Sequence, residues 1–409
     1  MGNLRVIAEF IIVCSFSLFL FIVPYSRRWG KYSLIASLVL VMVFRFLAHK
    51  RRLRPALGLA LSSRVPLILC LCACIAGIAF SNDPYQSQKI FVSRYLFFFI
   101  TAWAGFVLGR DFILRHIKFL AWVIMGISLY MASGGMRDYS VMSIQEPRLW
   151  TIWGRYTAFN MLPLYLASFM CFNYSFLAFW GRNALRWPAL INTWLFVPVI
   201  IWQQCRSAYP AVAGGLILVN FFRNKKLFLA ACGVIIVLVV SLAAVSDPFR
   251  AQLADYLDMD KWDNRLPLFH SALKMFRDRP AVGIGIGMFE HLIRTAPYEP
   301  PADYMPQYRD FFIHTHSFYL ETLAETGLIG IAVFAVIFAL FFRALARKLR
   351  AATDDTLRPL LAGCGAVIVV YLVFGITLSL ITVGLNESAV FWLFFGLAWG
   401  LIKREVEHG

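Results

Sequence analysis

Charged residues are scarce in this chain, and their scarcity decides its broad class. They make up 15% of the 409 positions, whereas hydrophobic residues make up 60%. A soluble protein rarely exceeds about half apolar residues. The composition therefore argues against a soluble enzyme and favours a protein buried in a membrane.

Apolar runs long enough to cross a bilayer recur along the whole sequence. A helix needs roughly 17 to 25 such residues to span the hydrocarbon core, so we predict an all-α polytopic membrane protein with about twelve transmembrane helices. The predicted spans are residues 6–24, 32–48, 65–80, 90–108, 117–133, 158–180, 189–204, 208–222, 227–245, 327–342, 361–382 and 388–402. Together they form a single integral membrane domain over residues 1–409.

The excess of basic residues follows the predicted topology. The net charge is +17, and Lys and Arg gather in alternate short loops, such as residues 50–54, 223–226 and 343–350. Basic loops mark the cytoplasmic side of a membrane protein. We therefore expect both termini in the cytoplasm, contacts with membrane lipids and no nucleic-acid partner. If the cell is Gram-negative, the membrane is the inner one and the opposite face is periplasmic.

One long polar segment, residues 246–326, interrupts the apolar pattern between spans nine and ten. It holds four of the seven histidines, and the topology makes it a periplasmic loop. An amphipathic pattern over residues 265–277 predicts a helix inside this loop. Gly283-x-Gly285-x-Gly287 lacks the spacing of a dinucleotide fingerprint and predicts a tight chain reversal. We expect the chemistry of the protein in this segment.

Cysteine is absent from the periplasmic loop, which excludes a disulfide framework there. Cys70-x-Cys72-x-Cys74 does not place three thiols on one helix face, so helix packing is favoured over metal binding. His314-x-His316 has no further ligands in suitable geometry for zinc. We therefore predict neither a metal site nor a cofactor.

Three polar groups are the main candidates for chemistry. Arg206 lies at the outer end of span seven, Arg265 opens the loop helix, and His314 and His316 precede span ten. Guanidinium groups bind pyrophosphate through paired hydrogen bonds, and a neutral histidine accepts a proton from an attacking hydroxyl. The competing interpretations are a lipid headgroup contact for Arg206, a surface arginine at position 265 and structural histidines.

Three further charges lie near or within the spans. Glu9 and Arg94 fall inside predicted spans one and four, where a charge serves function or an internal ion pair; they are also candidates to pair with each other. Arg155 closes an outer segment rich in tryptophan and either anchors the interface or faces an outer cavity.

A reaction on the outer face has no ATP and needs a donor that is already activated. A sugar on a lipid pyrophosphate meets this need, because pyrophosphate leaves readily once its charge is neutralised.

The chain resembles the O-antigen ligase and O-antigen polymerase superfamily of bacterial inner-membrane glycosyltransferases. The similarity covers nearly the whole chain and is most specific between Gln204 and Gly330. The matching positions are Arg206, Arg265, the Arg279-Pro280 and Gly283–Gly287 turn, His316, Leu320, Glu325, Gly327 and Gly330. Ser317 stands where many members carry asparagine.

The resemblance implies an O-antigen ligase with a metal-independent, inverting mechanism of the GT-C class. The donor would be a glycan on undecaprenyl pyrophosphate, and the acceptor a sugar of lipid A-core. Arg206 and Arg265 would hold the pyrophosphate, and His316 would orient or deprotonate the acceptor hydroxyl. Arg155, His314 and Glu325 are second-rank substrate-binding candidates. The apolar side chains of the spans would line a groove for the polyprenyl tail.

Three other functions compete with the ligase. An O-antigen polymerase shares the donor and the pyrophosphate chemistry. A protein O-oligosaccharyltransferase typically has a longer C-terminal region. A transporter of a lipid-linked glycan would distribute its substrate charges along the spans, whereas here they concentrate at one outer face.

Overall fold

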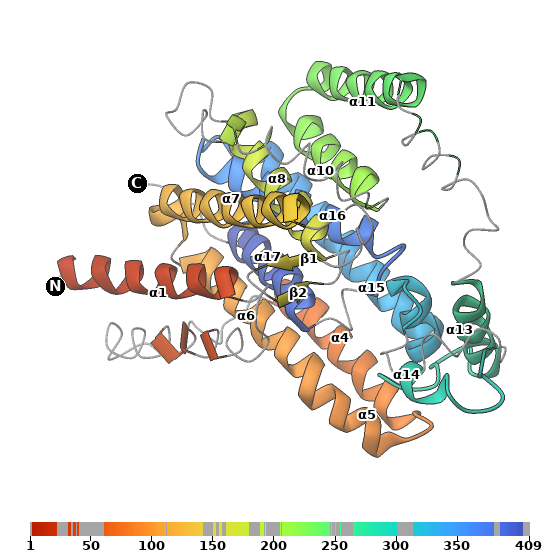
Figure 1. Cartoon of the computed structure of the whole chain (residues 1–409). Coiled ribbons are helices and arrows are strands. Elements are labelled where there is room, and N and C mark those ends of the chain that lie inside the picture. Colours follow the sequence, from red (N-terminus) through yellow and green to blue (C-terminus); the bar gives the residue numbers. More distant parts are fainter. Residues whose placement is uncertain are drawn as a thin grey trace.

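The computed structural model describes most of the chain as packed helices (Figure 1). The described residues are 2–22, 32–33, 36–37, 39–40, 61–111, 113–141, 150–152, 155–157, 161–179, 189–191, 193, 205, 207–245, 247, 250, 254, 265–300, 314–379 and 385–403. Predicted spans two and seven fall mostly outside these residues.

The helices follow the apolar runs of the sequence. They are α1 (Gly2–Ile22), α4 (Leu61–Ala79), α5 (Pro84–Ile90), the π-helical turn η1 (Phe91–Tyr95), α6 (Leu96–Asp111), the 3-10 turn η2 (Ile113–His116), α7 (Ile117–Val141), α8 (Met161–Phe179), α10 (Ala208–Arg223), α11 (Lys225–Val245), α13 (Leu266–Asp278), α14 (Phe289–Leu292), α15 (Phe318–Ala351), α16 (Leu357–Phe374) and α17 (Leu385–Lys403). Two short strands, β1 (Trp150–Ile152) and β2 (Arg155–Thr157), pair antiparallel with Ile152 opposite Arg155.

The fold is that of an all-α membrane protein, as the sequence predicts. Among the described residues, three helical stretches are long and apolar enough to cross a bilayer: Pro84–Arg110, Phe318–Ala351 and Leu357–Phe374. Shorter apolar helices accompany them. Large apolar side chains also lie on the outside, and on α11 Leu229, Ile236 and Val240 are each more than 60% exposed. Such surfaces suit lipid rather than water. The total of twelve spans stays a prediction.

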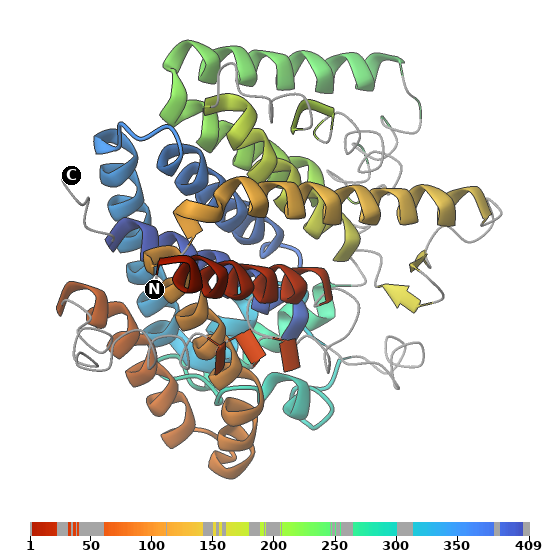
Figure 2. The same cartoon turned by 90° about the vertical axis from the view of Figure 1, so that its left-hand side faces the viewer.

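The interior of the bundle is built around α16 and α17. Of the three long stretches, Leu357–Phe374 is the most buried, at 78% of its apolar window. Helix α17 packs on α6 through glycines on both helices, and a Cβ on Gly396 or Gly400 would overlap the carbonyl of Ala102 or Phe106. Small residues let membrane helices approach closely, where van der Waals packing drives their association. Figures 1 and 2 both place α17 inside the bundle.

Helix α15 is broken at Gly327, which has a left-handed backbone (φ 61°). The break leaves backbone groups of α15 without partners inside the helix. Residues 280–288, called the glycine turn below, supply partners instead. The N–H groups of Ile284 and Gly285 donate to the carbonyls of residues 324 and 325, both at 3.0 Å. The N–H groups of residues 328 and 329 donate to the carbonyls of residues 280 and 281, at 2.8 and 3.1 Å.

The glycine turn also joins the outer segment to the corner between α4 and α5. The Asn82 N–H donates to the Ile284 carbonyl at 2.9 Å. The Ser87 hydroxyl donates to the Ile286 carbonyl, also at 2.9 Å. The turn thus holds α13 and α14 against both α15 and the α4–α5 corner. The start of α1 lies on the left of Figure 1, and α13 and α14 lie on the right.

Two predictions for the polar segment are confirmed. Helix α13 begins at Leu266, with Pro267 tolerated in its first turn, and ends at Asp278. Gly283, Gly285 and Gly287 all have positive φ, as a tight reversal requires. The helix after the histidines begins at Phe318, ahead of the predicted span, whose first residue is the break at Gly327.

Gly283→Ala should destabilise the protein strongly. A Cβ at this position would overlap the backbone of Glu325, and the backbone φ is +72°. We expect a loss on the order of 2 to 4 kcal/mol, seen as a lower thermal unfolding temperature in detergent. Gly126→Ala in α7 is the matched control, because a Cβ there meets nothing within 4 Å. Equal unfolding temperatures for the two variants would contradict the close approach.

Candidate active site

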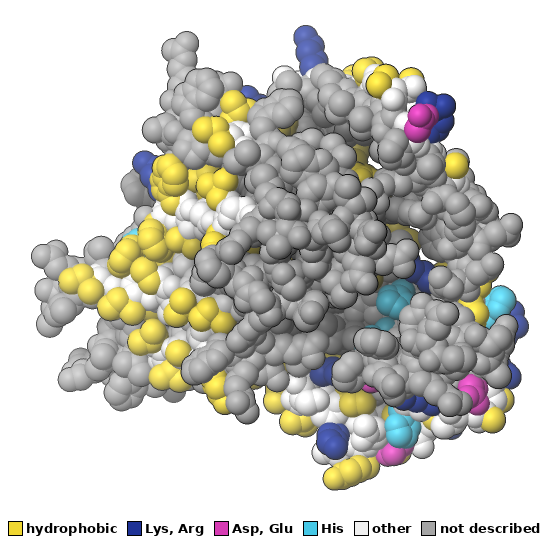
Figure 3. All heavy atoms as spheres, viewed as in Figure 1, with side chains coloured by type: hydrophobic (Ala, Val, Ile, Leu, Met, Phe, Trp, Pro, Cys, Tyr) yellow, Lys and Arg dark blue, Asp and Glu magenta, His cyan; other side chains and the backbone are white. Residues whose placement is uncertain are grey.

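Three chain segments that carry candidate residues meet around one turn, residues 375–379, at the end of α16. The segments are the start of α13, the start of α10 and residues 314–317, called the histidine loop below. Arg265, at the N-cap of α13, donates from Nη1 to the Thr377 carbonyl at 3.4 Å. Figure 3 shows histidine, basic and acidic side chains gathering on the side where Figure 1 places α13 and α14.

The same threonine reaches the start of α10. The hydroxyls of Thr377 and Ser207 share a hydrogen bond. Ser207 directly follows Arg206, which lies outside the described residues. On the other side of Arg206, burial raises the pKa of Cys205 to about 11, and the positive charge of Arg265 opposes this rise. Both neighbours of Arg206 therefore interact with the 375–379 turn or with Arg265.

The histidine loop is fixed on the 375–379 turn by two contacts. The Phe318 N–H donates to the Gly375 carbonyl at 2.8 Å. The hydroxyl oxygens of Thr315 and Ser379 lie 3.1 Å apart and share a hydrogen bond. The side chains of Thr315 and Ser379 are both buried. The loop therefore keeps a defined position relative to Arg265, which bonds to the same turn.

His316 has a left-handed backbone, with φ of 53°. This region is uncommon for residues other than glycine, and such conformations persist where the surroundings enforce them, often at functional sites. Here the Thr315 hydroxyl spans the turn. It accepts from the Ser317 N–H at 3.1 Å, and its one proton has two acceptors within reach, the Ser317 carbonyl at 2.7 Å and Glu321 Oε2 at 3.1 Å. Ser317 then caps α15 by accepting from the Leu320 N–H.

His316 is held in its neutral form. Burial lowers its pKa to about 4, and the charges of Arg265 and His314 act in the same direction, while Glu321 opposes them. Burial and a nearby cation both disfavour an imidazolium. At neutral pH the ring therefore carries one N–H donor and one free acceptor nitrogen.

His314 has a different neighbour. Its Nδ1 lies 3.6 Å from Oε1 of Glu321, a buried residue in the first turn of α15. The other oxygen, Oε2, lies 3.1 Å from the Thr315 hydroxyl. The sequence did not single out Glu321 as a partner of His314. The sequence shows that Glu321 lies one turn after the histidines. It does not show that the loop bends at His316 and brings His314 close to Glu321.

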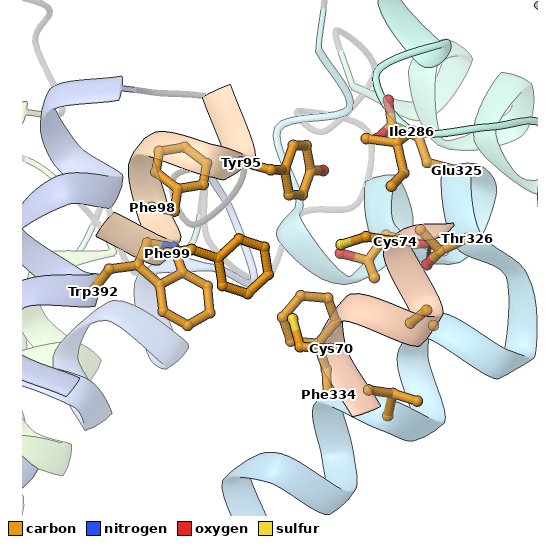
Figure 4. A pocket seen from close by; sticks show the side chains of 14 residues that line it. Cys70, Cys74, Tyr95, Phe98, Phe99, Ile286, Glu325, Thr326, Phe334 and Trp392 are labelled. Atoms are coloured by element: carbon orange, nitrogen blue, oxygen red, sulfur yellow. Dashed lines mark hydrogen bonds between the residues drawn. The ribbon is translucent and has the colours of Figure 1, made fainter. Parts of the chain in front are cut away.

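Glu325 lies one turn further along α15 and is also buried. Its Oε1 accepts from the Phe289 N–H at 3.1 Å, so its carboxylate holds the start of α14. It also lines a largely apolar cleft between α4, η1, α6, α15 and α17. In Figure 4, Tyr95, Phe98, Phe99 and Trp392 form one side of this cleft, opposite Cys74, Glu325 and Phe334.

The other charged candidates have varied surroundings. Arg94, on the π-helical turn η1, pairs with Glu290 of α14 at 3.4 Å. The internal ion pair expected of Arg94 is therefore present, but the guess that Glu9 is its partner is wrong. Glu9 itself is buried in α1. Arg155 is described only through its backbone, as a residue of β2.

Among the described residues, no three or more His, Cys, Asp or Glu side chains lie close enough together to hold a metal ion. Cys70 and Cys74 are free thiols on α4 and line the apolar cleft. Their surroundings fit helix packing.

The chain is similar to one known protein family over part of its length. Residues 191–335 match a family model described as O-antigen ligase. The match supports the O-antigen ligase and polymerase superfamily to which the sequence motifs point, and an O-antigen ligase-like, glycosyltransferase-like function in general. No curated protein matches the chain.

The matched region, residues 191–335, covers most of the segments that meet at the candidate site. It includes Arg206, Arg265, both histidines of the histidine loop and Glu325. Arg155 and the 375–379 turn lie outside it. The turn shows what sequence reasoning missed: Thr377 and Ser379 stand near the end of an apolar run, and their partners are 60 to 170 positions away.

The low pKa of His316 should appear in the stability of the protein. An unfolded histidine titrates near pH 6.5, so between pH 6.5 and about 4 the unfolded chain binds a proton that the folded chain excludes. This contribution to stability is complete above pH 6.5 and is lost as the pH falls towards 4. It amounts to roughly 3 to 4 kcal/mol.

The test compares thermal unfolding of the native chain and of His316→Asn between pH 7.5 and 4.5. Asparagine tolerates the left-handed backbone, so the variant keeps the loop and removes the titrating group. The native chain should lose more stability on acidification than the variant. Parallel curves would show that His316 titrates normally.

Proposed function

We propose that this protein is an O-antigen ligase that transfers a glycan from undecaprenyl pyrophosphate to a sugar hydroxyl of lipid A-core. The reaction is inverting and metal-independent, of the GT-C class, and takes place at the periplasmic face of the inner membrane. The observation that carries the proposal is the meeting of Arg265, the neighbours of Arg206 and the histidine loop at the 375–379 turn.

The chemistry of these groups suits a pyrophosphate leaving group. Arg265 and Arg206 bind the pyrophosphate and offset the negative charge that grows as the bond to the sugar breaks. His316 is neutral, so its acceptor nitrogen is available to orient or deprotonate the acceptor hydroxyl. The apolar cleft beside α15 gives the polyprenyl tail an apolar surface next to the polar site.

The broken helix α15 supports a transporter less well than it supports a ligase. In many transporters the ends of broken helices point at the substrate. Here the glycine turn occupies backbone groups on both sides of the Gly327 break. The break therefore serves the packing of the outer segment and leaves the candidate charges at one end of the bundle.

The test of the function is a lipopolysaccharide gel from a host that lacks its own ligase and carries this gene, with a compatible core. A polymerase-deleted host is run in parallel. A restored ladder in the first host alone supports the ligase. A change from core-plus-one-unit to a ladder in the second host assigns the protein as a polymerase and contradicts the proposal.

Arg265→Lys should reduce transfer by the purified protein about 10- to 100-fold, because lysine keeps the charge but loses the planar pair of donors. Arg277→Lys is the matched control, since Arg277 lies on the same helix and is exposed. The measurement is formation of labelled glycan–lipid product, without any ion gradient. Equal rates for the two variants would remove the pyrophosphate role of Arg265.

A further inference from the structure

The two histidines of the histidine loop have opposite electrostatic surroundings. His316 is affected by the cation of Arg265 and by burial, which both favour its neutral form. His314 has the carboxylate of Glu321 beside its Nδ1, at 3.6 Å. A carboxylate at this position stabilises positive charge on an imidazole. The two rings are therefore suited to different tasks.

The carboxylate of Glu321 is held in place rather than free to turn. Its Oε2 lies 3.1 Å from the Thr315 hydroxyl, which in turn shares a hydrogen bond with Ser379. Glu321 lies in the first turn of α15, where the helix dipole favours a negative charge. A buried carboxylate is costly unless it has such partners. Its orientation leaves Oε1 directed at His314.

An imidazole whose Nδ1 faces a carboxylate presents Nε2 on the other side of the ring. This is the arrangement in which a carboxylate fixes the tautomer of a histidine and stabilises the imidazolium that forms when Nε2 takes a proton. The distance of 3.6 Å is longer than a hydrogen bond. Catalytic hydrogen bonds are often long in the unliganded protein and shorten when substrate binds.

We propose that His314, paired with Glu321, accepts the proton of the acceptor hydroxyl, and that His316 is a neutral group that positions this hydroxyl. This inference rests on the proposed function and assigns the proton transfer within it. His314 is then a catalytic residue, and Glu321 is a positioning residue that acts through it.

The glycosyl transfer forms one bond, breaks one bond and moves one proton. The acceptor oxygen attacks the anomeric carbon of the donor sugar and forms the glycosidic bond. The bond between that carbon and the pyrophosphate oxygen breaks, and its electron pair leaves with undecaprenyl pyrophosphate. The hydroxyl proton moves to Nε2 of His314, whose charge is balanced by Glu321, and is later released to water.

Other titratable groups surround this pair and are present in every variant compared. Arg265 comes from α13, and His316 from the same loop. Glu325 lies one turn along α15, and Tyr95 of η1 interacts electrostatically with both glutamates.

The experiment measures kcat and KM of the purified full chain between pH 5 and 9, with undecaprenyl-pyrophosphate glycan as donor. His314→Asn should lower kcat about 100-fold or more. Glu321→Gln should lower kcat on the order of 10- to 1000-fold, with a nearly unchanged KM for the donor. In Glu321→Gln the acid limb of the pH profile should also move to lower pH, because the imidazolium loses its counter-charge.

The double variant separates a role through His314 from a structural one. If Glu321 acts through His314, His314→Asn combined with Glu321→Gln should be no slower than His314→Asn alone. Asp278→Asn is the control, because this carboxylate at the end of α13 accepts from the Tyr298 hydroxyl, away from the histidine loop. An undiminished further loss in the double variant, or an unchanged pH profile in Glu321→Gln, would overturn the pairing.

His314→Asn decides the proposal by itself if Glu321→Gln does not fold. Turnover within twofold of native in His314→Asn would assign the proton to another group and overturn the inference while leaving the ligase intact. A native chain that forms no glycosidic bond with any acceptor would instead remove the proposed function.

Discussion

The structure depends on a set of backbone hydrogen bonds that replace missing bonds inside helix α15. At Gly327 the helix cannot bond to itself, and the glycine turn provides donors and acceptors for four backbone groups around the break. Within a membrane protein an unsatisfied backbone group costs several kcal/mol. The break is therefore stable only with the turn in place, and the turn keeps its shape only against the break.

This mutual dependence sets the geometry of the candidate site. The part of α15 before Gly327 carries Glu321 and follows directly from the histidine loop, and the glycine turn follows directly from α13 and Arg265. Joining the turn to α15 thus brings the loop with the histidines and the helix with the arginine to the same end of the bundle. The 375–379 turn completes the contact, because it bonds to Arg265, to Ser207 and to the histidine loop.

The sequence was a good guide wherever a local pattern determines the structure. Apolar runs predicted the helical membrane fold, the amphipathic stretch after Arg265 predicted α13, and three glycines at alternate positions predicted a reversal. The order of arginine, glycine and histidine motifs also pointed to the family whose domain matches residues 191–335. The first three signals are local patterns, each carried by residues of one segment, whereas the order of the motifs extends from Arg206 to Gly330.

Long-range features could not be predicted in the same way. The break at Gly327 has no signal in an apolar run, because glycine is common in membrane helices, and its partners are backbone groups about 45 positions earlier. The pairing of Glu321 with His314 requires the left-handed turn at His316. Thr377 and Ser379 look like ordinary small residues of a span. Arg206 and the side chain of Arg155 lie outside the described residues, so their roles stay predictions.

The hydrogen bonds between the glycine turn and α15 are made by the main chain, and this has a consequence for genetic experiments on this protein. The glycines of the glycine turn therefore determine how much folded protein accumulates in the membrane, not the rate at which each folded molecule works. A mutational scan read out by the lipopolysaccharide ladder would score Gly283 and His314 as equally defective. Only when the abundance of each variant in the membrane is measured alongside the ladder would the two kinds of position separate, one by missing protein and the other by inactive protein.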